Sequence, residues 1–89
     1  MNLNEEKIHQ LFLSNEIKKI KSEINQETKY IEEVYTSNSE ENLNLLKQKI
    51  LDKYPYNPYF TQCLVYELHE DDIIDHNWQL IYTGSTTSD

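Results

Sequence analysis

The residues with the clearest chemical potential in this 89-residue chain lie in one acidic segment near its carboxyl end. Two histidines, His69 and His76, stand within or beside it, and imidazole together with carboxylate suits zinc or manganese. The spacing is not His-Glu-x-x-His, however, and the segment lacks the glycine and the alternating ligands of a calcium loop. We therefore predict neither a metal site nor a cofactor. The carboxylates of the segment are Glu67, Glu70, Asp71, Asp72 and Asp75.

Two interpretations of these carboxylates remain open. They can belong to a solvated turn, where water reduces the repulsion between two charges ~4 Å apart to about 1 kcal/mol. They can instead dock on a basic groove of a partner protein. Ile73 and Ile74 favour docking, because two large aliphatic side chains at the tip of a turn are poorly buried in a monomer. An apolar centre with a charged rim is typical of interfaces, although both isoleucines can also fold back onto the core.

No other group of residues forms a catalytic motif. Cys63 lies in a segment rich in aromatic and branched residues, and we interpret it as a small buried hydrophobic residue rather than a nucleophile. His9 lies on a predicted amphipathic helix, at its surface or boundary. A single glycine in the whole chain disfavours a glycine-rich phosphate loop. We predict that the protein is not an enzyme.

Three tyrosines surround two prolines in residues 54–59. They can pack over the junction between helices and strands. Alternatively, Tyr56 and Tyr59 offer a rigid binding area at a low entropy cost. Aromatic side chains also stack on nucleic acid bases, but that mode of binding needs a positive groove, and the surroundings here are negative. We therefore include Tyr56 and Tyr59 in the predicted docking surface and predict no direct binding of nucleic acid.

Charge is distributed unequally along the chain. All eight lysines lie between Lys7 and Lys53, and there is no arginine. The formal charge is therefore about −2 over residues 1–53 and about −6 over the remainder. Such an acidic field repels nucleic acid and anionic lipid and attracts basic surfaces.

The length and composition indicate one small domain, residues 1–83, with a flexible polar tail at 84–89. The single cysteine fits a reducing compartment, and no apolar stretch is long enough for a membrane span. We expect a cytoplasmic protein. The absence of alanine and arginine and the abundance of asparagine, isoleucine, lysine and tyrosine indicate an AT-rich genome, such as that of a low-GC bacterium or its phage.

The hydrophobic pattern predicts an α+β fold: a short N-terminal helix, an antiparallel helix pair and a C-terminal antiparallel β-hairpin. The first helix covers about 4–13 and ends near Ser14-Asn15, because the apolar residues on either side fall on different helical faces. Longer helices are expected at 16–35 and 40–53. Strands are expected at 60–68 and 78–83, where aromatic and branched residues gather.

The predicted second helix carries an apolar stripe at heptad spacing between residues 13 and 34. The stripe can be the inner face of the antiparallel helix pair, or it can form a dimeric coiled coil. The protein is accordingly expected as a monomer or a homodimer. The members of the stripe are Leu13, Ile17, Ile20, Ile24, Ile31 and Val34.

Together these features favour a small acidic interaction protein that blocks a basic, nucleic-acid-binding site on a larger protein. The small size and AT-rich composition suggest a phage or mobile-element inhibitor of host defence, of the anti-CRISPR or anti-restriction type. An immunity or antitoxin protein that neutralises a basic nuclease toxin is the alternative. A structural or regulatory homodimer through the stripe at 13–34 is a third possibility.

Overall fold

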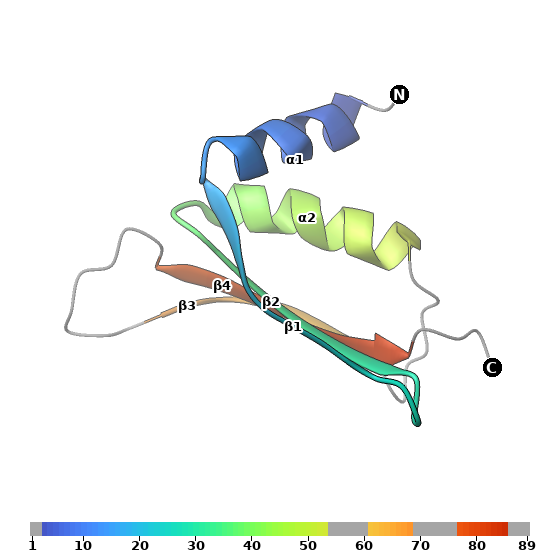
Figure 1. The fold of residues 1–89 in the computed structure, drawn as a ribbon. Helices are drawn as coiled ribbons and strands as arrows, with labels where there is room; N and C mark the ends of the chain where they lie inside the picture. The colour runs from blue at the N-terminus through green and yellow to red at the C-terminus, as the bar shows by residue number, and fades with distance from the viewer. Residues whose placement is uncertain (1–2, 54–60, 69–76, 86–89) are drawn as a thin grey trace.

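The computed structural model describes residues 3–53, 61–68 and 77–85. These residues form two helices and four strands, in the order helix, strand, strand, occurring twice (Figure 1). The molecule is therefore an α+β protein in which the sheet is dominant. Its elements are α1 (Leu3–Leu13), β1 (Ile17–Asn25), β2 (Tyr30–Ser37), α2 (Glu40–Lys53), β3 (Gln62–Glu67) and β4 (Trp78–Ser85).

The predicted helix over residues 16–35 is wrong, and with it the antiparallel helix pair of the predicted fold. This stretch forms the β1–β2 hairpin, paired from Ile17 opposite Ser37 to Asn25 opposite Tyr30. Isoleucines spaced by three and four residues suit one face of a helix, but β-branched and aromatic side chains also pack well on a pleated sheet. The sheet is the outcome here because β2 also pairs with β4, which a helix could not do.

The heptad stripe consequently does not exist as a surface. Ile17, Ile31 and Val34 are buried, whereas Ile20 and Ile24 are exposed. A coiled-coil dimer through residues 13–34 is therefore ruled out, because no helix runs through them.

The turn between β1 and β2 forms without glycine or proline. The side-chain oxygen of Asn25 accepts hydrogen bonds from the backbone N–H groups of Glu27 (2.9 Å) and Thr28 (3.1 Å). Lys29 takes a left-handed conformation, with φ of 60°. Among the described residues, one other non-glycine residue, Asn15, also has a positive φ, of 62°. The Lys29 N–H donates to the Asn25 carbonyl at 2.8 Å. Asparagine side chains stabilise turns in this way, so Asn25 fixes the reversal of the chain.

The predicted end of the first helix is confirmed. Glu16 N–H donates to the Leu11 carbonyl (2.9 Å) and Asn15 N–H to the Phe12 carbonyl (3.2 Å). With Asn15 in the left-handed region, this pattern is a Schellman motif, which satisfies carbonyls that the helix end would leave without partners. The motif turns the chain sharply from α1 into β1.

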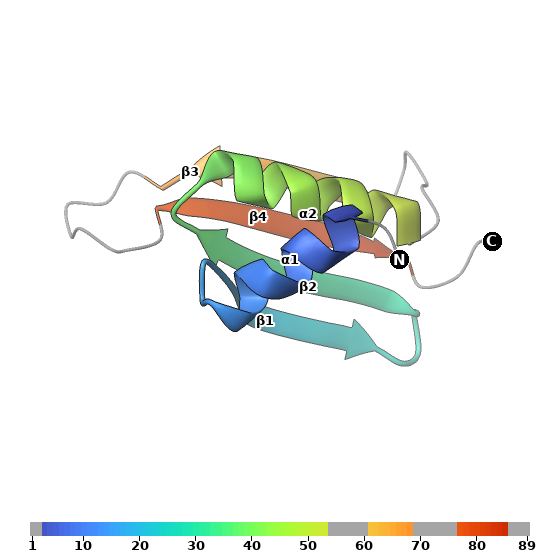
Figure 2. The ribbon, with the colours of Figure 1, turned by 90° about the horizontal axis from the view of Figure 1, so that it is seen from above.

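The four strands form one antiparallel sheet in the order β1-β2-β4-β3, so β1 and β3 are its edges. Both helices lie on the same face of the sheet (Figure 1). Seen from above, α2 lies along β4 and β3, while α1 crosses over the β1–β2 side (Figure 2). No described element covers the opposite face. The buried core lies between the helices and the sheet and is formed by Ile8, Leu11, Ile17, Ile31, Tyr35, Leu43, Leu46, Ile50, Cys63, Leu80 and Tyr82.

The remaining elements agree with the sequence. α2 has the predicted bounds and buries Leu43, Leu46 and Ile50. The two predicted C-terminal strands pair antiparallel, from Gln62 opposite Thr83 to Glu67 opposite Trp78. β4 continues to Ser85, two residues beyond the predicted strand.

Candidate functional site

Of the residues predicted to dock on a partner, Glu67 is described by the structure. It is the last residue of the edge strand β3 and is exposed. Just beyond it, the Leu68 N–H donates to the Asn77 carbonyl at 2.7 Å, so β3 and β4 stay paired up to both ends of segment 69–76. The predicted residues that lie outside the described residues are Tyr56, Tyr59, Glu70, Asp71, Asp72, Ile73, Ile74 and Asp75.

Cys63 is a buried core residue, as predicted. Burial raises the pKa of its thiol, and the nearby positive charge of Lys47 opposes this increase only in part. A thiol held in its neutral form is a poor nucleophile. Cys63 therefore contributes packing, and His9 is exposed on α1 as expected.

Two of the three lysines of β1, Lys19 and Lys21, lie near carboxylates of their own hairpin. Lys21 Nζ lies 2.5 Å from Glu32 Oε1 and 3.9 Å from Glu23 Oε2. The hydrogen bond with Glu32, and then the negative charge of Glu23, raise the pKa of Lys21. Lys19 Nζ lies 3.5 Å from Glu33 Oε2. Positive charge at this edge of the sheet is thus largely neutralised within the hairpin.

Sequence reasoning missed a buried carboxylate on β2. Glu33 is 5% exposed; it accepts a hydrogen bond from the Tyr35 hydroxyl and pairs with Lys19. Lys19 Nζ also lies 5.5 Å from the centre of the Tyr35 ring. The assignment of this stretch to a helix hid the arrangement, because residues 33 and 35 share a face in a strand and not in a helix.

Glu33 lies in a groove of about 500 Å³ between the helices and the β1–β2 hairpin. Its lining combines an apolar floor with three lysines and one glutamate. The arrangement can hold an amphipathic group but contains no nucleophile paired with a base. The lining residues are Phe12, Lys19, Ser22, Ile24, Ile31, Glu33, Tyr35, Leu46, Lys49, Ile50 and Lys53.

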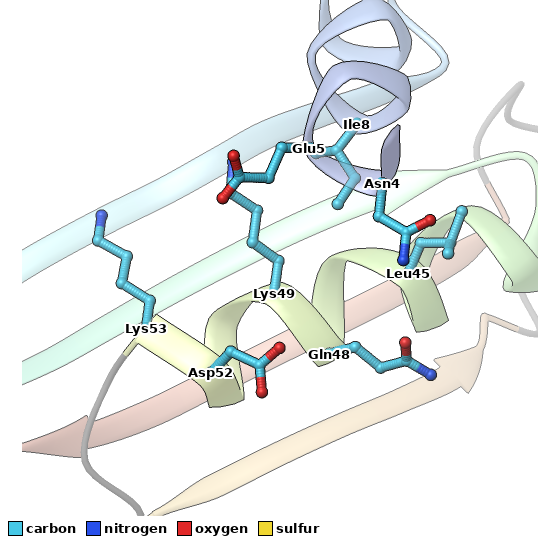
Figure 3. Close-up of a pocket in the computed structure, with 8 residues that line it drawn as sticks. All are labelled: Asn4, Glu5, Ile8, Leu45, Gln48, Lys49, Asp52 and Lys53. Atoms are coloured by element: carbon cyan, nitrogen blue, oxygen red, sulfur yellow. The ribbon is translucent and has the colours of Figure 1, made fainter. Parts of the chain in front are cut away.

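A smaller pocket of about 310 Å³ lies between the two helices (Figure 3). Lys49 of α2 extends toward Glu5 of α1, and Ile8 points between the helices (Figure 3). The other lining residues are amides, an aliphatic side chain and two further charges, so the pocket offers hydrogen bonds but no reactive group. They are Asn4, Leu45, Gln48, Asp52 and Lys53.

The two edges of the sheet are built differently. On β1 the pairing register shifts between Lys19 and Lys21, which leaves Ile20 as the extra residue of a bulge. β3 pairs with β4 without any shift. Bulges and lysines are common devices that prevent an edge strand from pairing with another chain. β1 has both devices, and β3 has neither.

The pairing of β3 also shows which of its backbone groups face outward. Leu68 and Asn77 form a hydrogen-bonded pair, and such pairs alternate along an antiparallel ladder. Leu64 and Tyr66 therefore direct their N–H and C=O groups toward β4, while Cys63 and Val65 direct theirs toward the open edge. The side chains of Cys63 and Val65 pack into the core, so Leu64 lies on the uncovered face, where it is 56% exposed.

Within the described ranges, no three His, Cys, Asp or Glu side chains lie close enough together to hold a metal ion. Neither α1 nor α2 has the length and apolarity needed to cross a membrane. Comparison of the chain with family models, curated proteins and solved structures finds no match.

Proposed function

We propose that the protein is a small acidic inhibitor, without enzymatic activity, that covers a basic nucleic-acid-binding site on a larger protein. The docking surface comprises the acidic segment 67–75 with Ile73 and Ile74, together with Tyr56 and Tyr59. The distribution of charge over the sheet is the observation that carries this proposal.

The β3–β4 side of the molecule contains no lysine on its strands. The lysines of the sheet, Lys18, Lys19 and Lys21, lie on β1 at the opposite edge. Three strand spacings separate β1 from β3, about 14 Å in total. This distance exceeds the Debye length of about 8 Å at physiological ionic strength, so the β1 lysines do not screen Glu67, at the end of β3, from an approaching partner. Lys47 lies closer, near Cys63, but five carboxylates in residues 67–75 outnumber it.

A nucleic-acid-processing enzyme is the partner class that this charge pattern fits best. Such enzymes bind phosphates with clustered lysine and arginine side chains, and an acidic protein surface competes for the same side chains. The composition, typical of AT-rich genomes, supports a phage or mobile-element origin and an anti-CRISPR or anti-restriction role in the cytoplasm of a bacterial host.

The test is a competition assay with purified DNA-processing enzymes of a low-GC bacterium, including CRISPR and restriction nucleases. Each enzyme is bound to fluorescent DNA, and the protein is titrated in at several salt concentrations. We expect displacement of DNA from one enzyme class, with an affinity that falls as salt rises. The absence of displacement from every nuclease tested, at low as well as at physiological salt, would contradict the proposal.

A matched pair of variants distinguishes displacement through the proposed docking surface from displacement caused by the net negative charge of the protein. Asp71, Asp72 and Asp75 changed together to Asn should abolish displacement. The control changes Glu6, Glu27 and Glu41 to Gln; all three are exposed and lie outside the proposed surface. It alters the net charge equally and should leave displacement unchanged. Equal losses in both variants would show that net charge, and not this segment, is responsible.

A further inference from the structure

We propose that the open edge of β3 pairs with β3 of a second copy of this chain, giving a two-fold symmetric dimer with one continuous sheet. The pairing is antiparallel and centred on Leu64. This inference does not depend on the proposed function, because it concerns a different surface property, the backbone groups of an edge strand.

The outer edge of β3 carries backbone groups that can form hydrogen bonds with another strand. Cys63 and Val65 each direct one N–H and one C=O group to the open edge, as the pairing with β4 requires. No described strand lies on that side of β3. Edge groups of this kind are a template for strand addition, and here neither a lysine nor a bulge blocks the approach.

The β3 strand is complementary to a second, antiparallel copy of itself. If Leu64 lies opposite Leu64 of the second copy, Cys63 lies opposite the second copy's Val65, and Val65 opposite its Cys63. Each of these pairs joins two residues with outward backbone groups, so all four groups on each chain find partners. In this pairing, the side chains of two opposite residues point to the same face of the sheet. The helices of both copies therefore lie on one side of the continuous sheet.

Leu64, at the centre of the proposed pairing, has an exposed apolar side chain. Its side chain is 56% exposed on the uncovered face of the sheet. On that face it stands opposite Ile81, which stands opposite Val34. Pairing with the second Leu64 covers both leucines and extends this apolar row across the dimer.

Charge permits this pairing locally and opposes it at long range. Glu67 is the only charged residue of β3 and lies opposite Thr61 of the second copy, not opposite another acid. The two whole chains, however, each carry a formal charge of −8. Added salt should therefore strengthen the dimer, because it screens the repulsion. This is opposite to the salt dependence expected for docking on a basic partner.

The structure of the other edge explains why the assembly stops at two copies. β1 has a bulge at Ile20 and lysines at positions 18, 19 and 21. It therefore does not offer a second regular edge for further strand addition. An isologous contact through β3 alone closes after one partner and cannot continue into a fibre.

The test uses two positions with nearly equal exposure, Leu64 at 56% and Ile20 at 57%, one on each edge of the sheet. Each is changed to Cys in a Cys63→Ala background and oxidised. Directly opposite residues in a non-hydrogen-bonded pair have Cα atoms about 4.5 Å apart, within the range of a disulfide. We expect Leu64→Cys to form a covalent dimer and Ile20→Cys to remain monomeric. Equal cross-linking of the two variants, or none, would overturn the proposal.

Sedimentation equilibrium of the unmodified chain provides a second measurement that does not depend on the Cys63→Ala background. We expect a dimer at micromolar concentration whose affinity rises with salt. Leu64→Lys should weaken it by at least about tenfold, since it places like charges directly opposite each other, while Ile20→Lys should not. A monomer at every salt concentration would refute the dimer but leave the displacement of DNA by the protein untouched. Dimers that persist in Leu64→Lys would show that another surface is responsible.

Discussion

The two halves of the molecule, α1–β1–β2 and α2–β3–β4, share the same order of elements. They differ in the burial of their edge and central strands and in the positions of their lysines. In β1 only the first of nine residues is buried, whereas α2 and β4 bury most of their inward side chains. The first half pairs Lys19 and Lys21 with its own glutamates, and the second half has no lysine beyond α2. Both halves therefore contribute to the core, but the first half ends the sheet with an exposed strand rich in lysine, and the second half ends it with a strand that has none.

The largest expected difference is between the core packing of β4 and that of β1. Leu80 on β4 is 0% exposed, and replacing a buried leucine by alanine costs about 3 kcal/mol. Ile24 on β1 is exposed, so Ile24→Ala should cost less than about 1 kcal/mol. Urea unfolding followed by Trp78 fluorescence measures both free energies. Similar losses in the two variants would show that β1 is packed as tightly as β4.

The next largest difference is between the contributions of two carboxylates, Glu33 and Glu67, to stability. Glu33→Ala removes a buried acceptor from the Tyr35 hydroxyl and the partner of Lys19, and should destabilise the fold by about 1–3 kcal/mol. Glu67→Ala changes an exposed residue, and we expect an effect within about 0.5 kcal/mol. Thermal unfolding monitored by circular dichroism compares them. Glu33→Gln, which keeps an acceptor oxygen, should fall between the two; a loss equal to that of Glu33→Ala would assign the whole effect to charge.

The smallest expected effect is a loss of folding stability at alkaline pH, to which Cys63 and Lys21 contribute in different pH ranges. Burial raises the pKa of Cys63, and Glu32 followed by Glu23 raises that of Lys21. A raised folded-state pKa gives stability that is complete below the unfolded value and is lost as pH rises through the folded one. Stability should therefore begin to fall above pH 9.0 because of Cys63, and above pH 10.5 because of Lys21.

Unfolding free energies of Cys63→Ala and Lys21→Met across this range separate the two contributions. Differences from the unmodified chain cancel the titration of the other residues. We expect Cys63→Ala to remove the decline that begins near pH 9.0 and Lys21→Met the later one. A decline near pH 9.0 that persists in Cys63→Ala would assign it to another group.

Local patterns in the sequence predicted four of the six elements, which are α1, α2, β3 and β4. The change of apolar face near Ser14-Asn15 predicted the end of α1, and the hydrophobic pattern of residues 40–53 predicted α2. Aromatic and branched residues gave β3 and β4. Each of these signals acts within a few residues, which is why the sequence alone sufficed.

The β1–β2 hairpin could not be found in the same way. Its turn depends on Asn25 and a left-handed Lys29, with no glycine to mark it. All five residues from Glu33 to Ser37 are buried, so β2 shows no alternation of exposed and buried positions. A central strand of this kind is recognised by its neighbours in the sheet, and one neighbour, β4, lies far along the chain. Glu33 and its groove were missed for the same reason.

The strand order also determines when the sheet can close during synthesis. β4 is made after β1, β2 and β3, yet it pairs with β2 on one side and β3 on the other. The β1–β2 hairpin can form early, but the inner edge of β2, with Val34 and Tyr35, must wait for β4. Pairing between such distant segments is slow and leaves a nascent chain exposed to aggregation. The yield of folded protein in the cell should therefore depend on how quickly β4 leaves the ribosome and inserts between its two neighbours.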